Sequence, residues 1–261
     1  MLRNDMGADG RAFVESEPPT FATVEEERRH RLERTAAVCR VFGRLGYSEG
    51  LLGHVTVRDP EHEDRFWINP VGTSFRQMKV SDLVQVSRDG QVTHGSGIIN
   101  PVGFRLHAGV HDARPEVNAV CHAHSLYGKA WSSLGRPLDP ITQDSAVFFE
   151  QQAIITHPRV ALDDAGGREF ADAFGDKRVG IHVGHGLFST GETVEEAAWW
   201  FITMETSCKA QLLAEAAGDP IHWRDDEARM MVAALGTPLF GWASFQPFWN
   251  EIIATDPDLL D

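Results

Sequence analysis

Two histidines, His122 and His124, close the apolar run VNAVCHAHS at residues 117–125. The run has the length and composition of a buried strand, in which residues i and i+2 project from the same face. Two neutral imidazoles held side by side in this way are a chelate for a first-row divalent metal ion. The alternative is a pair of unrelated polar residues at a strand end, and the His-x-His spacing alone leaves both interpretations open.

A third histidine, His185, lies between Gly184 and Gly186 in the sequence HVGHGLFSTG. The two glycines permit positive φ angles and a close approach of the backbone, as expected where the chain turns after a strand. His182, three residues earlier, competes for the same role. An ordinary turn histidine is the alternative interpretation of His185.

The composition is that of an ordinary globular protein. Of 261 residues, 42% are hydrophobic and 24% are charged, and no shift in composition indicates a second domain. The formal net charge of −14 disfavours sequence-independent binding to nucleic acid or to an anionic membrane surface. No apolar run approaches the length of a membrane span. We therefore expect neither nucleic acid nor a membrane as a partner.

The N-terminal residues are polar and acidic and lack the basic start and apolar segment of a signal peptide. Cys39, Cys121 and Cys208 are far apart and odd in number, which fits reduced thiols better than a disulfide framework. We expect a cytoplasmic protein. Residues 1–23 are interpreted as a flexible or partner-wrapped arm, and residues 24–261 as a single domain with an aromatic-rich C-terminal tail.

Periodicity and capping residues give the order of the secondary structure. Helices are predicted over 24–45, 100–115, 126–135, 164–176, 193–218 and 225–235. Strands are predicted over 53–59, 65–70 and 117–125, in a hairpin over 82–95 that turns at Asp89-Gly90, in two short strands within 137–158, and in a pair over 178–191. Most connections are hairpins or short loops. The pattern predicts an α/β protein with a mixed sheet between layers of helices.

Together, four segments resemble the class II aldolase/adducin family: SEGLLGHVTVRD (48–59), INPVGTSF (68–75), HDARPEVNAVCHAHS (111–125) and GHGLFSTGETVEEAAW (184–199). The resemblance implies a three-layer α/β/α fold with a central, mostly antiparallel sheet. It also implies a homo-oligomer, commonly a tetramer, with the active site near a subunit interface. The family's three metal ligands map onto His122, His124 and His185, which implies one divalent ion per subunit, either Zn, Fe(II), Mn or Co.

The sequence departs from the sugar-phosphate aldolases of this family at the position of their catalytic acid, where it has Gly103. The residues at the phosphate-binding positions are also changed and mostly apolar: His54, Val71, Pro101 and Val102. Gly72 and Thr73 could still donate hydrogen bonds to a smaller anion such as a carboxylate. We therefore expect a non-phosphorylated small-molecule substrate beside His54, Gly72, Thr73 and Gly103.

Three further residues are candidates for proton transfer in place of the missing acid. Tyr127 follows the histidine pair, and Asp144 and Glu150 lie on a segment that in this family can reach a neighbouring subunit's site. Packing is the alternative interpretation of Tyr127, and a solvated loop charge is that of the two acids. His107 and His111, four residues apart on a predicted helix, are interpreted as surface or packing residues.

Three functions remain open. A three-histidine metal ion with open positions is a Lewis acid, which fits a lyase of the aldolase or decarboxylase type acting next to a carbonyl or carboxylate, with an aromatic substrate expected. The same site with Fe(II) fits an oxygenase that oxidatively decarboxylates an aryl 2-oxo or 2-hydroxy acid. The third function is that of a non-catalytic, adducin-like interaction module.

Overall fold

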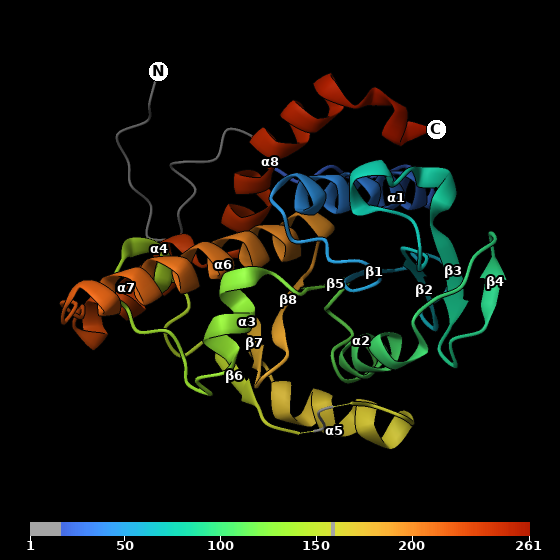
Figure 1. Cartoon of the computed structure of the whole chain (residues 1–261). Coiled ribbons are helices and arrows are strands. Elements are labelled where there is room, and N and C mark those ends of the chain that lie inside the picture. The colour runs from blue at the N-terminus through green and yellow to red at the C-terminus, as the bar shows by residue number, and fades with distance from the viewer. Residues whose placement is uncertain (1–16, 158–159) are drawn as a thin grey trace.

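Eight strands pair into one sheet in the order β4-β3-β2-β1-β5-β8-β7-β6 in the computed structural model, which describes residues 17–157 and 160–261 (Figure 1). β6 and β7 are parallel, and the other neighbouring strands are antiparallel. The predicted mixed, mostly antiparallel sheet is confirmed. The strands are β1 (His54–Arg58), β2 (Arg65–Ile68), β3 (Val84–Ser87), β4 (Val92–His94), β5 (Ala119–Ala123), β6 (Gln152–Ile155), β7 (Val179–His182) and β8 (Gly186–Gly191).

Helices cover both faces of this sheet and complete the expected three-layer α/β/α architecture (Figure 1). One face is covered by α1 (Val24–Arg44) and α6 (Val194–Ala217), with α8 (Pro238–Thr255) packed on the outer side of both, and the other face by α2 (Pro101–Ala113) and α5 (Asp164–Phe174). The shorter helices are α3 (Leu126–Ser132), α4 (Gln143–Ala146) and α7 (Asp225–Leu235), with 3₁₀ turns η2 (Phe75–Gln77), η3 (Val80–Asp82) and η4 (Pro257–Leu260).

Side chains cap the long helices where the sequence predicts that they begin. The hydroxyl of Thr23 accepts a hydrogen bond from the backbone N–H of Glu26 ahead of α1. Thr193 does the same for Glu196 ahead of α6. Each cap satisfies a donor that lacks a partner within the helix. The aromatic-rich tail starts in the same way and forms α8, because Thr237 caps a helix with Pro238 in its first turn.

Alternation along the central strands assigns each side chain to one layer. On β1, Val55 belongs to the hydrophobic core shared with α1 and α6, whereas His54 and Thr56 project toward α2. On β5, Cys121 belongs to that same core, and His122 lies on the α2 side, opposite His54. The sheet therefore places a row of polar side chains under α2.

One local prediction is wrong. Two short strands are predicted within 137–158, but over the described residues 137–157 only β6 forms, and residues 143–146 form α4. The cause is reciprocal capping between Thr142 and Ser145. The Thr142 hydroxyl accepts from the Ser145 N–H, and the Ser145 hydroxyl accepts from the Thr142 N–H, which starts a helical turn.

The predicted N-terminal arm is described only from residue 17 onward, and residues 1–16 lie outside the described residues. Phe21 packs on His30 of α1, with ring centroids 5.0 Å apart. Among the helices of residues 17–157 and 160–261, none combines the length and the apolar character needed to cross a membrane.

Two glycines let α2 and α5 touch through their backbones. A Cβ on Gly109 would lie 2.2 Å from the carbonyl oxygen of Gly167, and a Cβ on Gly167 would lie 2.6 Å from the carbonyl oxygen of Arg105. No side chain fits at either position without separating the helices. The two helices therefore pack side by side at backbone distance.

We expect Gly109→Ala to lower the free energy of unfolding by about 1–3 kcal/mol, because the added methyl group forces the two helices apart. Helix propensity alone favours alanine over glycine by about 1 kcal/mol, so a loss of stability can be attributed to the close contact between α2 and α5. Urea denaturation measures the effect. Ala113→Ser at an exposed position of α2 is the control, expected within about 0.5 kcal/mol of wild type. A Gly109→Ala protein as stable as wild type would contradict the close crossing.

Candidate metal centre

Three histidines from distant parts of the chain converge beside the ends of β5 and β8. His122 lies in β5, His124 follows just beyond its end, and His185 lies in the turn between β7 and β8. One ring nitrogen of each lies within 4.8 Å of the others. His122 is buried, and His124 and His185 are half-buried. The group is therefore anchored in the sheet and accessible on the side of His124 and His185.

The backbone holds the imidazole of His122 in one tautomer. The ring nitrogen Nδ1 lies 2.8 Å from the carbonyl oxygen of Leu187 in β8, and it donates because a carbonyl only accepts. Its Nε2 lies 3.2 Å from the Nε2 of His185. Two imidazole nitrogens bound to one tetrahedral zinc ion would lie roughly 3.3 Å apart. The donor set therefore fits a divalent ion, and the Leu187 carbonyl orients one ligand.

Burial keeps these imidazoles in the neutral form that binds metal. Burial and then the neighbouring histidines lower the pKa of His122 well below its usual value. The same causes lower the pKa of His185 to about 3. For His124, burial and then Lys129 lower the pKa, against the opposing effect of Glu49. Lys129 and Glu49 form an ion pair with an N–O distance of 2.6 Å.

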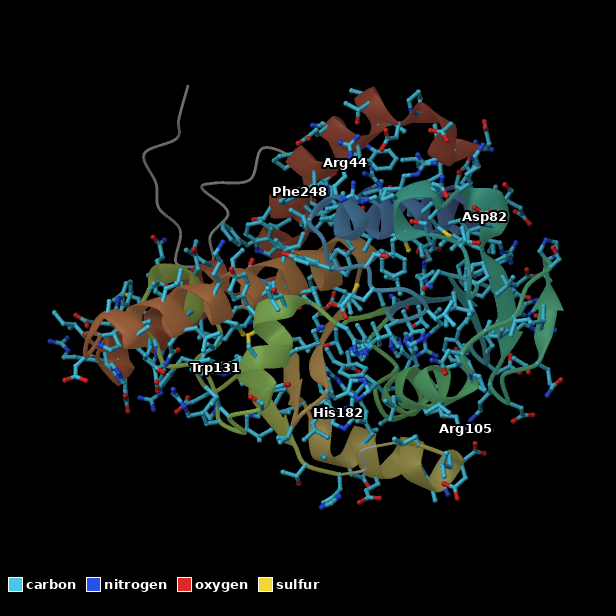
Figure 2. All side chains as sticks on the ribbon, viewed as in Figure 1. Arg44, Asp82, Arg105, Trp131, His182 and Phe248 are labelled. Atoms are coloured by element: carbon cyan, nitrogen blue, oxygen red, sulfur yellow. The ribbon has the colours of Figure 1, made fainter. Side chains whose placement is uncertain are left out.

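His182, the competing candidate, lies beside this group. Its ring is fully buried, stacks on His185 with centroids 4.7 Å apart and meets Phe170 of α5 (Figure 2). The group whose ring nitrogens approach one another contains His185 and not His182. The geometry thus favours His185 as the third donor.

A buried carboxylate on α6 fixes the chain directly after the histidine pair. Glu205 accepts hydrogen bonds from the Ser125 hydroxyl at 2.5 Å, from the Tyr127 N–H at 2.9 Å and from the Gly128 N–H at 2.6 Å. These donors belong to the start of α3, so the carboxylate caps that helix from outside. His124 is adjacent to Ser125, and the cap therefore limits the positions that its ring can take.

His54 and Gly103, two predicted substrate-binding positions, lie face to face. A Cβ on Gly103 would lie 2.3 Å from Cε1 of His54, so the imidazole occupies the space of a side chain at position 103. The ring of His54 lies 5.9 Å from that of His122. Gly72 and Thr73 lie in the loop after β2, where Gly72 is exposed with φ +95°. Their assignment to a substrate anion stays a prediction.

The three candidates for proton transfer lie in different surroundings. Tyr127 packs against the main core, with Lys209 Nζ 5.1 Å from its ring centroid. Asp144 is exposed in α4. Glu150 is exposed, and its carboxylate pairs with Arg229 of α7 at 2.7 Å. The catalytic roles of all three stay predictions.

His107 and His111 are expected to be either surface or packing residues, and the expectation of a surface position is wrong. Both rings are buried between α2 and β1, and both form hydrogen bonds to Thr56 at 2.9 Å. In Figure 2, side-chain nitrogen atoms gather in this region between α2 and the sheet. The i, i+4 spacing of the histidines was a signal for a shared face, but it does not say which face α2 buries.

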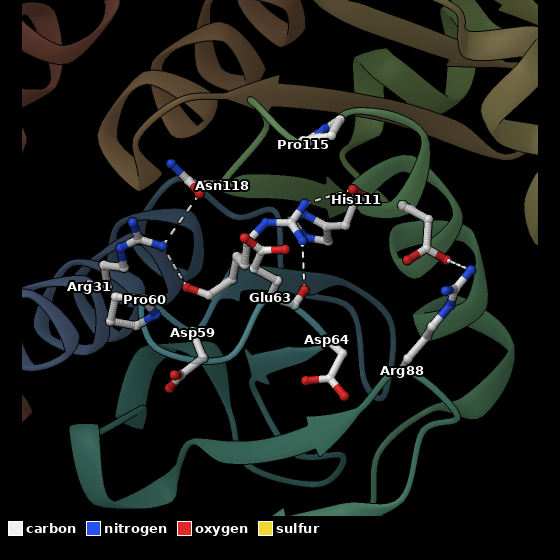
Figure 3. Close-up of a pocket in the computed structure, with 11 residues that line it drawn as sticks. Arg31, Asp59, Pro60, Glu63, Asp64, Arg88, His111, Pro115 and Asn118 are labelled. Carbon is white, nitrogen blue, oxygen red and sulfur yellow. Dashed lines mark hydrogen bonds and ion pairs between the residues drawn. The ribbon is translucent and has the colours of Figure 1, made fainter. Parts of the chain in front are cut away.

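A large cavity of about 470 Å³ lies elsewhere, and its lining contains none of the three converging histidines (Figure 3). Its arginines already have partners. Arg58 donates to the carbonyl oxygens of Glu63 and His111, Arg31 donates to that of Arg58, and Arg88 pairs with Asp112. Each of these guanidinium groups is thus held by partners in the protein, although the Nε of Arg58 makes no hydrogen bond within the described residues.

A second group of side chains close enough together to ligate one metal ion lies near this cavity and consists of Asp59, Glu61 and His62. Asp59 already accepts from Arg28, Trp67 and Gln85. Arg28 also donates to Glu61 at 2.5 Å. A guanidinium therefore takes the place that a cation would need, and the group is a structural ion pair.

We expect Glu205→Gln to lower the free energy of unfolding by about 1–3 kcal/mol, because the amide places a donor against buried donors at the start of α3. Urea denaturation measures this loss. Glu215→Gln on the same helix removes an exposed ion pair with Arg136 and is the control, with an expected change of about 0–1 kcal/mol. Equal free energies of unfolding for the two variants would contradict the role of Glu205 in holding the start of α3.

Comparison with known proteins gives consistent results. Residues 33–212 match the family model described as Class II Aldolase and Adducin N-terminal domain. Decarboxylase NovR of Streptomyces niveus is 41% identical over 248 residues, which is 93% of this chain and 91% of that protein. The 4-hydroxy-3-prenylphenylpyruvate oxygenase/4-hydroxy-3-prenylbenzoate synthase of Streptomyces roseochromogenus subsp. oscitans is 40% identical over 247 residues, which is 93% of this chain and 88% of that protein.

Among solved structures, the L-fuculose 1-phosphate aldolase from Glaciozyma antarctica PI12 superposes with a TM-score of 0.88 at 40% sequence identity. The match covers 94% of this chain and 97% of that one. The family model spans most of the chain, and these relatives match it over nearly its whole length. The chain belongs to the class II aldolase and adducin family.

Proposed function

We propose that this protein is a divalent-metal-dependent lyase that breaks or forms a carbon–carbon bond next to a carbonyl or carboxylate of a non-phosphorylated, aromatic substrate. The observation that carries the proposal is the convergence of His122, His124 and His185 with neutral imidazoles. A scaffold protein has no use for one buried and two half-buried imidazoles whose ring nitrogens face one another, since burying polar groups is costly. A bound metal ion would supply Lewis-acid stabilisation of negative charge that develops on a substrate oxygen.

The residues around this group support a substrate other than a sugar phosphate. The position of the family's catalytic acid is Gly103, and the space above it is filled by His54. The family's phosphate-binding positions hold Val71, Pro101 and Val102, which offer no side-chain donor. Two relatives at 40–41% identity are named as a decarboxylase and as an oxygenase and synthase of prenylated aromatic acids. A third, at 40%, is named as a sugar-phosphate aldolase, which makes the substrate class the first matter to test.

The alternative with a specific observation in its favour is an Fe(II) oxygenase that decarboxylates an aryl 2-oxo or 2-hydroxy acid. Its support is the name of the second relative, an oxygenase that is 40% identical to this chain over 93% of its length. The same three histidines would hold the iron. An adducin-like module without catalysis is the remaining candidate, and it predicts no retained metal.

We further propose that the protein assembles as a homotetramer in the cytoplasm, as its family resemblance implies. Large apolar side chains are exposed, notably Leu51 and Ile98 in loops and Leu126 at the start of α3, with exposed fractions of 61%, 77% and 64%. Burial of such side chains between subunits would be favourable. Light scattering after size-exclusion chromatography measures the subunit number, and a monomer at micromolar concentration would contradict this assembly.

We expect His124→Ala to lose bound divalent metal, because two imidazoles remain where three converge. The residue is half-buried at a strand end, so we expect the circular-dichroism spectrum to be unchanged. Metal content by mass spectrometry is the measurement, on protein purified without added metal. His222→Ala, at an exposed position, is the matched control and keeps wild-type metal. Wild-type metal content in His124→Ala would refute the ligand assignment.

Assays with and without oxygen separate the functions. We expect carbon dioxide or aldehyde release from aryl 2-oxo acids or hydroxybenzoates without oxygen, with zinc, manganese or cobalt bound, and no cleavage of L-fuculose 1-phosphate. Turnover that requires oxygen and bound iron would assign the oxygenase instead. A protein that retains no metal and turns over none of these compounds would favour the non-catalytic interaction module over both enzymes.

A further inference from the structure

A strip of buried polar side chains runs beneath α2, beside the candidate metal centre. His54 and Thr56 are two residues apart on β1, so both face α2. Gly103, His107 and His111 are four residues apart along α2, so they share one face of the helix. His54 is 4% exposed, His107 0% and His111 1%. The strip therefore lies in the protein interior between one strand and one helix.

Hydrogen bonds fix the positions of the protons on His111, Thr56 and His107. His111 Nδ1 lies 3.1 Å from the carbonyl oxygen of Val117 and must donate to it. The neutral His111 ring then has a bare Nε2, which accepts the hydroxyl proton of Thr56 at 2.9 Å. The Thr56 oxygen has used its one proton, so it accepts from His107 Nδ1 at 2.9 Å. The Nε2 of His107 is consequently a bare lone pair.

This assignment of protons requires that the imidazoles of His107 and His111 are neutral, and their burial favours the neutral form. Burial, and then the charge of Arg58, lower the pKa of His111 to about 3. Burial, with smaller effects of His54 and His111, holds the pKa of His107 well below its usual value. Phe188 packs on the other side of His107, with ring centroids 5.6 Å apart. Both rings are therefore neutral at physiological pH.

The lone pair of His107 lies near the unpartnered nitrogens of His54. Among the described residues, neither nitrogen of His54 nor the Nε2 of His107 has a hydrogen-bond partner. The two rings are 5.7 Å apart and nearly perpendicular. The Nδ1, Cε1 and Nε2 edge of His54 faces Gly103, as the 2.3–2.8 Å approaches to a Cβ built there show. His54 thus lies between His107 and His122, with rings 5.7 and 5.9 Å away.

We propose that His54 and His107 form a subsite for a neutral hydroxyl group of the substrate, next to the metal centre. The proposal rests on the function proposed above and names the substrate class more closely, as a hydroxyl-bearing and preferably phenolic acid. A hydroxyl donates its proton to the His107 Nε2 and accepts the N–H of His54. A carboxylate or phosphate only accepts, so its lone pairs would face the lone pair of His107. Thr56 and His111 are positioning residues that set this polarity.

Binding of matched acids to the zinc-loaded protein tests the subsite. We expect 4-hydroxyphenylpyruvate to bind roughly tenfold more tightly than phenylpyruvate or its 4-methoxy derivative, neither of which can donate a proton there. Thr56→Val removes the hydroxyl that fixes His107 and should reduce this ratio to near one. Thr56→Ser keeps the hydroxyl and should retain the ratio. Titration calorimetry measures all three proteins.

A second measurement does not depend on metal or on activity. Nitrogen NMR of the metal-free protein distinguishes a bare from a protonated ring nitrogen, and we expect a bare Nε2 on His107 in wild type and in Thr56→Ser. Gly103→Ala should displace His54 and abolish the hydroxyl preference while His107 keeps its tautomer. A protonated Nε2 on wild-type His107, or a hydroxyl preference unchanged in Thr56→Val, would overturn the subsite.

The subsite and the proposed function fail in different ways. Metal-dependent turnover of aryl 2-oxo acids with no preference for the hydroxyl overturns the subsite and leaves the function intact. A hydroxyl preference that follows the Thr56 variants in a protein without bound metal or turnover supports the subsite and contradicts the lyase.

Discussion

The site depends on the antiparallel pairing of β5 with β1 on one side and β8 on the other. This register sets His122 opposite His54 across one pair and opposite Phe188 across the other. The same pairing puts the Leu187 carbonyl within reach of the His122 ring. A slip of one residue would turn every side chain of β5 to the opposite face and place the apolar Cys121 where the imidazole now lies. Apolar burial on the α1 and α6 face therefore fixes the polar geometry on the α2 face.

Burying these polar side chains lowers the free energy of unfolding, and packing elsewhere in the molecule compensates for that loss. Buried polar atoms without partners cost about 1–3 kcal/mol each, and His54 and His107 contribute three of them. They lie beneath α2, whose Gly109 packs directly against the backbone of α5 at Gly167 in the same layer. The start of α3 is held in a similar way by the carboxylate of Glu205. Rigid packing on both sides thus maintains an arrangement that the site alone would not favour, as is common where a protein binds a ligand.

Local patterns predicted the fold and the histidine pair, because both depend on short-range geometry. The period of two places His122 and His124 on one face, and the caps at Thr23 and Thr193 mark the starts of the long helices. What sequence reasoning missed depends on contacts between distant segments. The burial of His107 follows from where α2 packs, and the partners of Glu205 lie near 80 residues away along the chain. The glycines on either side of His185 made it a candidate donor, but they did not exclude His182, and only the resemblance to a family favoured His185.

Gly103 and His54 face each other across the β1–α2 interface and compete for one volume. The imidazole occupies the volume that a side chain at position 103 would need, with Cε1 at 2.3 Å from the Cβ position. A carboxylate introduced at position 103 alone would therefore meet a ring and not an open site. Conversely, a smaller residue at position 54 would leave a gap against a bare glycine, and gaps in a buried layer cost packing energy. A larger side chain at position 103 therefore requires His54 to move, so the residues at these two positions constrain each other across the β1–α2 interface.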